Sequence, residues 1–189
     1  MAKLAGLLEV EAAPGGRHPD EGTHNALIGL GPDCYLEIVG PDGGPLPDRP
    51  RWFGLDEFRA PGLVGWAARG EKLEELVLLA RRAGVALGPV RQGGRVRPDG
   101  VALSWSLTDA HTVLEDGLVP FFIDWGASPH PATTAAPGCR LLDLRGEHPQ
   151  PDRVHEALRA LGIALRVDAG PKPALIAVLD TPRGVVELR

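Results

Sequence analysis

The chain has 189 residues, a length that suits one domain or two small ones, and 43% of them are hydrophobic and 24% charged. Its net charge of −5 argues against a nucleic-acid-binding protein, which needs a basic surface patch. No apolar run approaches the ~20 residues of a membrane span, so we expect a soluble globular protein without a membrane partner.

The N-terminus and the cysteines indicate the compartment. The opening MAKLAGLLEVEAA is too short and too acidic for a secretory signal. Cys34 and Cys139 are far apart and follow neither a metal-binding nor a redox spacing. Free thiols in a reducing compartment are the simplest interpretation, and this predicts a cytoplasmic protein.

In the first third of the chain, glycine and proline separate short elements. Residues 3–12 suit a helix that ends before Pro14-Gly15-Gly16. Thr23–Leu30 and Cys34–Val39 have the patterning of two strands joined by a tight turn. Residues 41–61 have the composition of a loop, and 63–69 fit a helix or a strand equally well.

Two later segments show helical periodicity. EKLEELVLLARRAG (71–84) has leucines at helical spacing, charges on the other face and Gly84 to end it. DRVHEALRALG (152–162) has Asp152 in the N-cap position and Gly162 at its end. Residues 127–139 have loop composition. Strands are predicted at 85–91, around Arg95–Arg97, and at 101–107, 118–126, 163–167, 174–179 and 184–188.

This order of elements repeats. Residues 63–107 read β-α-β-β, residues 118–188 read β-α-β-β-β, and residues 4–40 read α-β-β, the same unit without its first strand. We therefore expect an α+β protein, with one domain over 1–189 built of a truncated unit at 1–40 and units at 63–107 and 118–189.

Several strings in order resemble one family. GGRHPDEGTHNALIGLG, YLEIVGP, RVRPDGVALSW, and PFFIDW with a following HP are similar to the glyoxalase-like domain proteins of the vicinal oxygen chelate superfamily. The resemblance implies βαβββ units that form open, cup-shaped mixed or antiparallel sheets with helices outside. It also implies a small-molecule ligand and, where a metal is present, a divalent ion (Zn, Mn, Fe, Ni or Mg) held inside the cup by His and Glu.

Glu37 interrupts an apolar strand. Alternation places Tyr35, Glu37 and Val39 on one face and Leu36 and Ile38 on the other. If the second face is buried, Glu37 points into the cup, where a carboxylate needs a cation or hydrogen-bond donors. The alternative is an exposed Glu on an open strand face. The resemblance matches Glu37 to a metal-ligand position with a catalytic role.

The sequence also departs from the family. The family's first strand carries a His, but this chain begins at the following helix, and the comparable places in the other two units hold Leu63 and Pro120. Either the site has lost its metal, or the ligands come from elsewhere, or the start of the chain is incomplete.

Other residues are candidates beside a structural role. Asp124, an acid in an apolar strand, is a second catalytic candidate, and Glu187 is the counterpart of Glu37 in the third unit and a second candidate metal ligand. Arg95 and Arg97 share a strand face and can present two guanidiniums to one anion, and the resemblance favours Arg97. The candidate substrate-binding residues are His18, Asn25, Arg97, Trp105, Phe122 and His130.

Two functions remain open. One is an enzyme in which a metal or positive donors stabilise enolate-like charge while a carboxylate moves a proton, as a lyase, isomerase or dioxygenase. The other is a metal-free cup that binds or sequesters a small anionic or aromatic ligand without catalysis. A homo-oligomer such as a dimer is expected because the absent first strand leaves a sheet edge unpaired.

Overall fold

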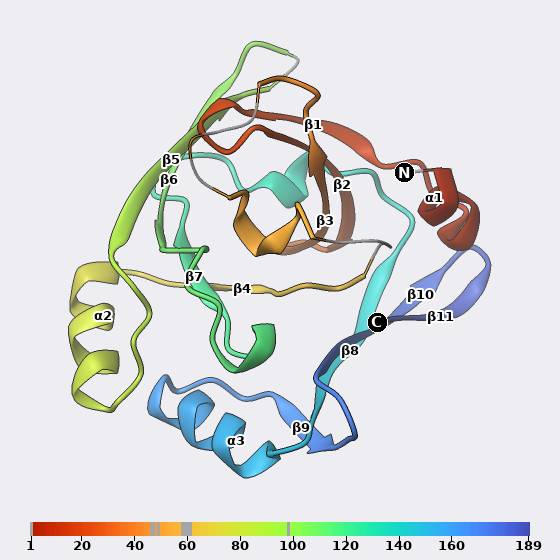
Figure 1. Cartoon of the computed structure of the whole chain (residues 1–189). Coiled ribbons are helices and arrows are strands. Elements are labelled where there is room, and N and C mark those ends of the chain that lie inside the picture. Colours follow the sequence, from red (N-terminus) through yellow and green to blue (C-terminus); the bar gives the residue numbers. More distant parts are fainter. Residues whose placement is uncertain (1, 46–47, 49, 58–61, 98) are drawn as a thin grey trace.

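The computed structural model describes residues 2–45, 48, 50–57, 62–97 and 99–189, without the side chains of Ala2 and Lys3. In this part of the chain, three β-sheets and three α-helices form the fold (Figure 1). Antiparallel and parallel strand pairs with few helices confirm the predicted α+β class. Of the loop predicted at 41–61, residues 46, 47, 49 and 58–61 lie outside the described residues.

The first sheet is antiparallel throughout and follows a short helix. The helix is α1 (Ala2–Leu8), and the strands in spatial order are β1 (Ala13–His18), β2 (Thr23–Gly31) and β3 (Cys34–Pro41). β2 and β3 confirm the two predicted strands. β1 was not predicted, because Pro14-Gly15-Gly16 signals a break in a helix. The same small residues let β1 pair with β2 through an irregularity between Pro14 and Gly16.

The second sheet has four strands, and a helix packs on it. In spatial order the strands are β4 (Ala67–Arg69), β7 (Phe121–Asp124), β6 (Ala102–Thr108) and β5 (Val90–Val96), and the helix is α2 (Leu73–Arg82). β7 pairs parallel to β4 and antiparallel to β6. The segment 118–126, which the sequence assigned to the third unit, thus pairs with strands of the second sheet.

The third sheet contains one strand that was not predicted. Its strands in spatial order are β11 (Gly184–Leu188), β10 (Ala174–Thr181), β8 (Arg140–His148) and β9 (Arg166–Ala169), with helix α3 (Pro151–Ala160) between β8 and β9 in sequence. β8 occupies the place that the sequence suggested for 118–126. The N-cap of α3 is Gln150, not Asp152, because Pro151 fits the first helical turn, where its missing N–H costs nothing.

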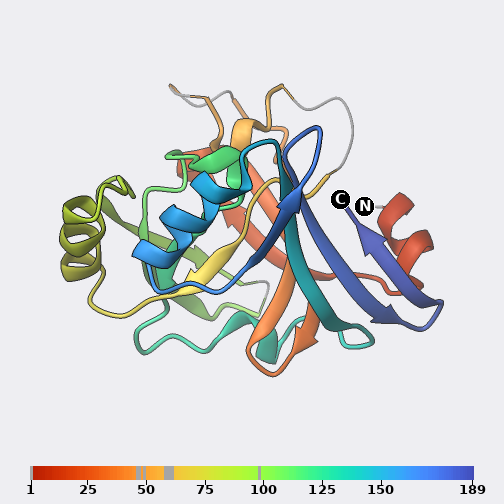
Figure 2. The same ribbon diagram turned by 90° about the horizontal axis from the view of Figure 1, so that it is seen from below.

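The first sheet has two buried faces. On one face Ile28, Leu36 and Ile38 pack with Leu8 of α1 and Leu179 of the third sheet. Figure 2 shows the strands of the third sheet, in blue and teal, beside those of the first sheet, in orange. The other face turns toward the second sheet, since β1 runs beside β5 and the ring of His18 meets that of Trp105 on β6. We call the interior between these two sheets the cup. Polar residues from both sheets point into it.

β3 lies at the edge of the first sheet, and no strand in the described part of the chain pairs with its outer side. The predicted pairing of two copies stays a prediction, which sedimentation velocity at rising protein concentration tests. The division of the single domain into units 1–40, 63–107 and 118–189 likewise stays an interpretation of element order. None of the described helices is long and apolar enough to cross a membrane.

Candidate functional site

Glu37 lies in the middle of β3, and its side chain points into the cup. It is opposite Leu27 of β2, so the two side chains share one face of the sheet. Leu36 and Ile38 point the other way, into the cluster between the first and third sheets. The side-chain amide of Asn25 donates a hydrogen bond from Nδ2 to Glu37 Oε1 over 2.5 Å. The inward orientation expected from alternation is therefore present.

Burial dominates the electrostatics of this carboxyl group. Loss of hydration raises the pKa of Glu37 above its ordinary value, although the Asn25 hydrogen bond and the charge of Arg95 act in the opposite direction. Burial also raises the pKa of Tyr35, on the same face of β3, and the charge of Glu37 adds to this effect. Arg95 is the cation nearest to these groups, and burial lowers the pKa of its guanidinium.

Arg95 enters the cup from the second sheet. It lies opposite Leu103 in the β5–β6 pair and is only 7% exposed. Its Nη1 atom is buried and has no hydrogen-bond partner among the described residues, and the same is true of Asn25 Oδ1. Such atoms are rare in folded proteins, because an unsatisfied buried polar group costs about 1–3 kcal/mol. Arg95 Nη1, a donor, and Asn25 Oδ1, an acceptor, are therefore available to hydrogen-bond a molecule bound in the cup.

Gly15 of β1 makes room for this arrangement. A Cβ atom at this position would lie 2.1 Å from Asn25 Oδ1 and 3.1 Å from Arg95 Nη1. Both unsatisfied atoms thus lie against the same glycine. The side chain of Asn25 has no space to retreat, since Nδ2 is held by Glu37.

We expect Gly15→Ala to lower the free energy of unfolding by about 1–3 kcal/mol, the usual cost of overpacking a filled interior. Urea unfolding measures the change. Gly6→Ala is the matched control, because a Cβ on Gly6 of α1 meets no atom within 4 Å. Equal stability of the Gly15→Ala protein and wild type would contradict the tight packing of Asn25 against β1.

Aromatic rings surround the polar centre. They form one continuous series of contacts, with neighbouring ring centroids 4.9–6.2 Å apart. The indole Nε1 atoms of Trp52 and Trp125 are buried and have no partner in the described part of the chain. His18, Trp52 and Trp105 also line a cavity of about 100 Å³. The series runs Tyr35, His130, Trp125, Trp105, His18, Trp52, Phe53, Phe121.

Four of the predicted substrate-binding residues lie at or near the cup. Asn25, His18 and Trp105 are buried in it. Burial, together with the charges of Arg95 and His24, lowers the pKa of His18 to about 4, so its imidazole is neutral at pH 7. His130 is half-buried, and its ring contacts those of Tyr35 and Trp125.

The other predicted residues of the second sheet lie elsewhere. Arg97 is at the end of β5 and forms an ion pair with Asp99 over 2.5 Å, so the arginine inside the cup is Arg95. Phe122 packs in the cluster beneath α2. Asp124 shares that face of β7 and accepts a hydrogen bond from the Gly126 N–H over 2.8 Å at the surface. Asp124 therefore ends its strand and does not approach Glu37.

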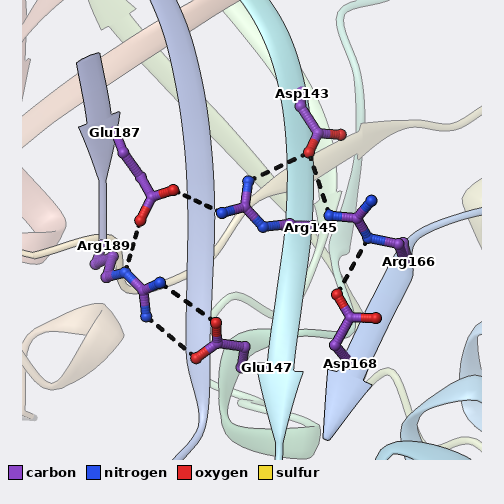
Figure 3. Close-up of polar contacts among 7 residues, drawn as sticks. All are labelled: Asp143, Arg145, Glu147, Arg166, Asp168, Glu187 and Arg189. Carbon is purple, nitrogen blue, oxygen red and sulfur yellow. Dashed lines mark hydrogen bonds and ion pairs between the residues drawn. The ribbon is translucent and has the colours of Figure 1, made fainter. Parts of the chain in front are cut away.

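Glu187 lies in the third sheet, within a network of ion pairs (Figure 3). Its two carboxylate oxygens accept from Arg145 and Arg189 over 2.6 and 2.8 Å. These partners lower the pKa of Glu187, with the Arg189 hydrogen bond as the largest cause. Glu37 and Glu187 belong to different sheets, and nothing in this geometry makes them ligands of one metal. The network comprises Asp143, Arg145, Glu147, Arg166, Asp168, Glu187 and Arg189.

Comparison with known proteins agrees with this architecture. The family model of the glyoxalase-like domain matches residues 1–162. The chain belongs to the glyoxalase-like domain family. This confirms the resemblance found in the sequence and places the chain in the vicinal oxygen chelate superfamily.

Solved structures support the fold of this glyoxalase-like domain. A crystal structure of a hypothetical protein from Staphylococcus aureus superposes with a TM-score of 0.62 at 12% identity, covering 87% of this chain and 79% of that one. At this identity the likeness shows the fold alone. No curated protein matches the sequence.

The superfamily often holds a divalent metal, and such an ion requires several donor side chains close together. Among the described residues, no three His, Cys, Asp or Glu side chains gather closely enough to hold a metal. Glu37 has the Asn25 amide as its hydrogen-bond partner, and the charge of Arg95 acts in favour of its ionised form. Divalent ions prefer several carboxylate, imidazole or thiolate ligands. The residues of the cup do not fit such an ion.

The candidate site of this glyoxalase-like domain includes residues outside the predicted set of catalytic, substrate-binding and metal-binding residues. Tyr35 was signalled by its alternation with Glu37, and Arg95 by its pairing with Arg97 on one strand face. Trp125 follows Phe121 and Ile123 at strand spacing, which could have placed it inside the cup. Trp52 had no local signal, because it lies in a proline- and glycine-rich loop.

Proposed function

We propose that the cup binds a small molecule bearing a carboxylate or carbonyl oxygen, with Arg95 as its main donor. The observation that carries this proposal is the pair of buried, unsatisfied atoms, Arg95 Nη1 and Asn25 Oδ1, between two sheets that also enclose a series of aromatic rings. An anionic oxygen at Arg95 gains a charge-assisted hydrogen bond, worth about 1.5–3 kcal/mol. A hydroxyl or amine hydrogen of the same molecule satisfies Asn25 Oδ1.

Glu37 makes binding of an acid dependent on protons. A carboxylate next to the ionised Glu37 side chain is repelled, so the bound state favours the protonated form. The pKa of Glu37 is already raised by burial, which makes this protonation inexpensive. An acid therefore binds together with a proton, and its affinity falls as pH rises.

Binding can be measured by the fluorescence of the tryptophans in the cup. We expect lactate or pyruvate to change the emission, and lactamide to bind at least tenfold more weakly because it lacks the charge. Arg95→Lys retains a cation but loses the Nη1 donor, and should weaken binding tenfold or more. Arg97→Lys is the matched control, two residues along the chain and just past the end of β5, and should bind within twofold of wild type.

Two outcomes would contradict the proposal. If Arg97→Lys weakens binding and Arg95→Lys does not, the anion contacts the end of β5 and not the cup. If none of the carboxylates changes the fluorescence or melting temperature of the protein, small acids are not its ligands.

A second candidate is proton transfer at a carbon next to a carbonyl, and the raised pKa of Glu37 favours it. The ionised Glu37 carboxylate takes the proton from carbon, the carbon–hydrogen electron pair moves into a carbon–carbon double bond, and the carbonyl oxygen becomes negative. Arg95 Nη1 then donates to that oxygen. Exchange of the methyl hydrogens of pyruvate for deuterium, followed by NMR, tests this reaction. The exchange should be lost in Glu37→Gln and kept in Asp124→Asn.

A further inference from the structure

A short segment bridges the two sheets of the cup. Residues 51–56, which we call the strap, place the ring of Trp52 5.1 Å from that of His18 on β1. The next side chain, Phe53, lies 5.8 Å from Phe121 on β7. In Figure 1 the helical turn of this segment, gold in the colour scale, lies between the strands of the first sheet and those of the second. The strap therefore spans the cup from one wall to the other.

Arg51 fastens one end of the strap. Its side chain is 6% exposed, and its Nε atom donates to the carbonyl oxygen of Gly22 over 3.0 Å. Asp56 accepts from the backbone N–H of Arg51 over 2.9 Å and from its Nη1 atom over 2.5 Å. These bonds, the backbone one first, hold the pKa of Asp56 below its usual range. We call these bonds of Arg51 to Gly22 and Asp56 the hook. The hook fixes the strap to the turn before β2, and none of its bonds involves the Trp52 ring.

The closed strap carries two unfavourable features. Phe53 has a φ of 57°, in the left-handed region that bulky side chains avoid. The Nε1 atom of Trp52 is buried without a hydrogen-bond partner among the described residues. Strain and an unsatisfied donor on adjacent residues are typical of segments that change conformation at a site. A ligand oxygen within reach of Trp52 Nε1 removes the second of these costs.

The cavity beside the strap is small. The space beside His18, Trp52 and Trp105 is about 100 Å³, whereas a cavity of about 150 Å³ is known to hold benzene. Molecules of more than a few heavy atoms need more room than the closed form gives. Trp52 is one of the walls of this cavity that belong to neither sheet, together with Pro19–Glu21 and residues 109–111, and displacing it enlarges this space without breaking strand pairs.

We infer that Trp52 is a ligand-binding residue, carried by a strap that swings from the cup to admit a molecule and returns to donate its indole N–H to a ligand oxygen. This inference rests on the proposed function, since it names a further contact to the same ligand. Arg51 is a positioning residue: it sets how readily the strap leaves and returns.

The NMR resonances of the indole N–H groups report whether Trp52 of the strap contacts a bound ligand. In protein labelled with ¹⁵N-tryptophan, the Trp52 indole resonance, assigned by its loss in Trp52→Phe, should move on addition of lactate. The Trp66 resonance should not, because Trp66 Nε1 already donates to the carbonyl oxygen of Leu118 in another cluster. A Trp52 resonance that stays in place while the Trp105 and Trp125 resonances shift would overturn the inference.

Variants separate the strap from the cup. Trp52→Phe keeps a ring but loses the donor, so its affinity for lactate should fall about fivefold to tenfold, with Trp66→Phe as control. Arg51→Met releases the hook and should raise association and dissociation rates together, at least threefold each. Unchanged affinity in Trp52→Phe and unchanged rates in Arg51→Met would contradict the role of the strap.

The Arg95→Lys variant separates this inference from the proposed function. Weakened binding of lactate to Arg95→Lys under the same conditions shows that the cup is still the site. If lactate binds wild type and Arg95→Lys equally, or does not bind at all, the proposed function fails first.

Discussion

Arg95→Met is expected to lower the free energy of unfolding by about 3 kcal/mol at pH 8, and by much less at pH 5. The loss follows from Glu37, which keeps its burial but loses the cation that offsets it. The figure is at the lower end of the cost of breaking a buried ion pair, because Glu37 and Arg95 interact through space and not through a hydrogen bond. Urea unfolding at the two pH values measures the difference.

The pH dependence has a definite sign. In the folded protein the pKa of Glu37 is above its unfolded value of about 4.5, and removal of Arg95 raises it further. Between those values the folded state binds more protons than the unfolded state, so stability falls as pH rises. As pH falls through the raised folded pKa, the folded variant takes up the proton and escapes most of the penalty.

Two further variants isolate the interaction. Glu37→Gln combined with Arg95→Met should recover about 2 kcal/mol relative to Arg95→Met alone at pH 8, because no buried carboxylate remains. Arg97→Met removes a partly exposed arginine two residues along the chain and should change stability by less than about 0.5 kcal/mol. A cost of Arg95→Met that does not depend on pH would mean that its packing, and not its charge, stabilises the cup.

The inward direction of Glu37 was predictable because it depends on local information. The register of a hairpin is fixed by its short turn, and alternation then assigns every side chain to one of two faces. Leu36 and Ile38 are apolar and Glu37 is not, so the pattern names the face that packs on the third sheet. To predict that Glu37 is buried, one more fact was needed, namely that Arg95 lies on the facing sheet. No local sequence pattern supplies this fact.

The same reasoning left the face of Asp124 open. Alternation correctly groups Asp124 with Phe122, and Phe121 with Ile123, but both sets contain large apolar residues. The helix α2 decides between them by burying Phe122. That choice depends on which sheet β7 joins, and its parallel pairing with β4 connects segments more than fifty residues apart. Long-range parallel pairing leaves no trace in a single strand.

β8 was missed for a related reason. Its sequence, RLLDLRGEH, carries Asp143, Arg145 and Glu147 on one face, and a register shift opposite Val178 and Leu179 interrupts the alternation. The charged face is solvated and held by the network of Figure 3. A half-polar strand with a bulge resembles a loop when seen alone, and only its partners β9 and β10 identify it.

His18 is expected to make the protein lose stability as pH falls from about 6.5 to about 4. Its folded pKa is lowered to about 4, whereas in the unfolded chain it is near 6.5. In this window the unfolded state binds a proton that the folded state excludes, so the free energy of unfolding decreases with falling pH. At about 1.4 kcal/mol for each pH unit, the total contribution is about 3 kcal/mol.

The groups around His18 allow this contribution to be isolated. Arg95 and His24 oppose its protonation, and Thr23 Oγ1 lies 3.2 Å from its Nδ1. Glu37 acts in the opposite direction across the same window, since its raised pKa favours the folded state as pH falls. His18→Asn should therefore flatten or reverse the fall in stability below pH 6.5, and Glu37→Gln should steepen it. Parallel pH profiles for wild type and His18→Asn, recorded by urea unfolding, would show that the imidazole is protonated in the folded cup, where it would then share the binding of an acid with Arg95.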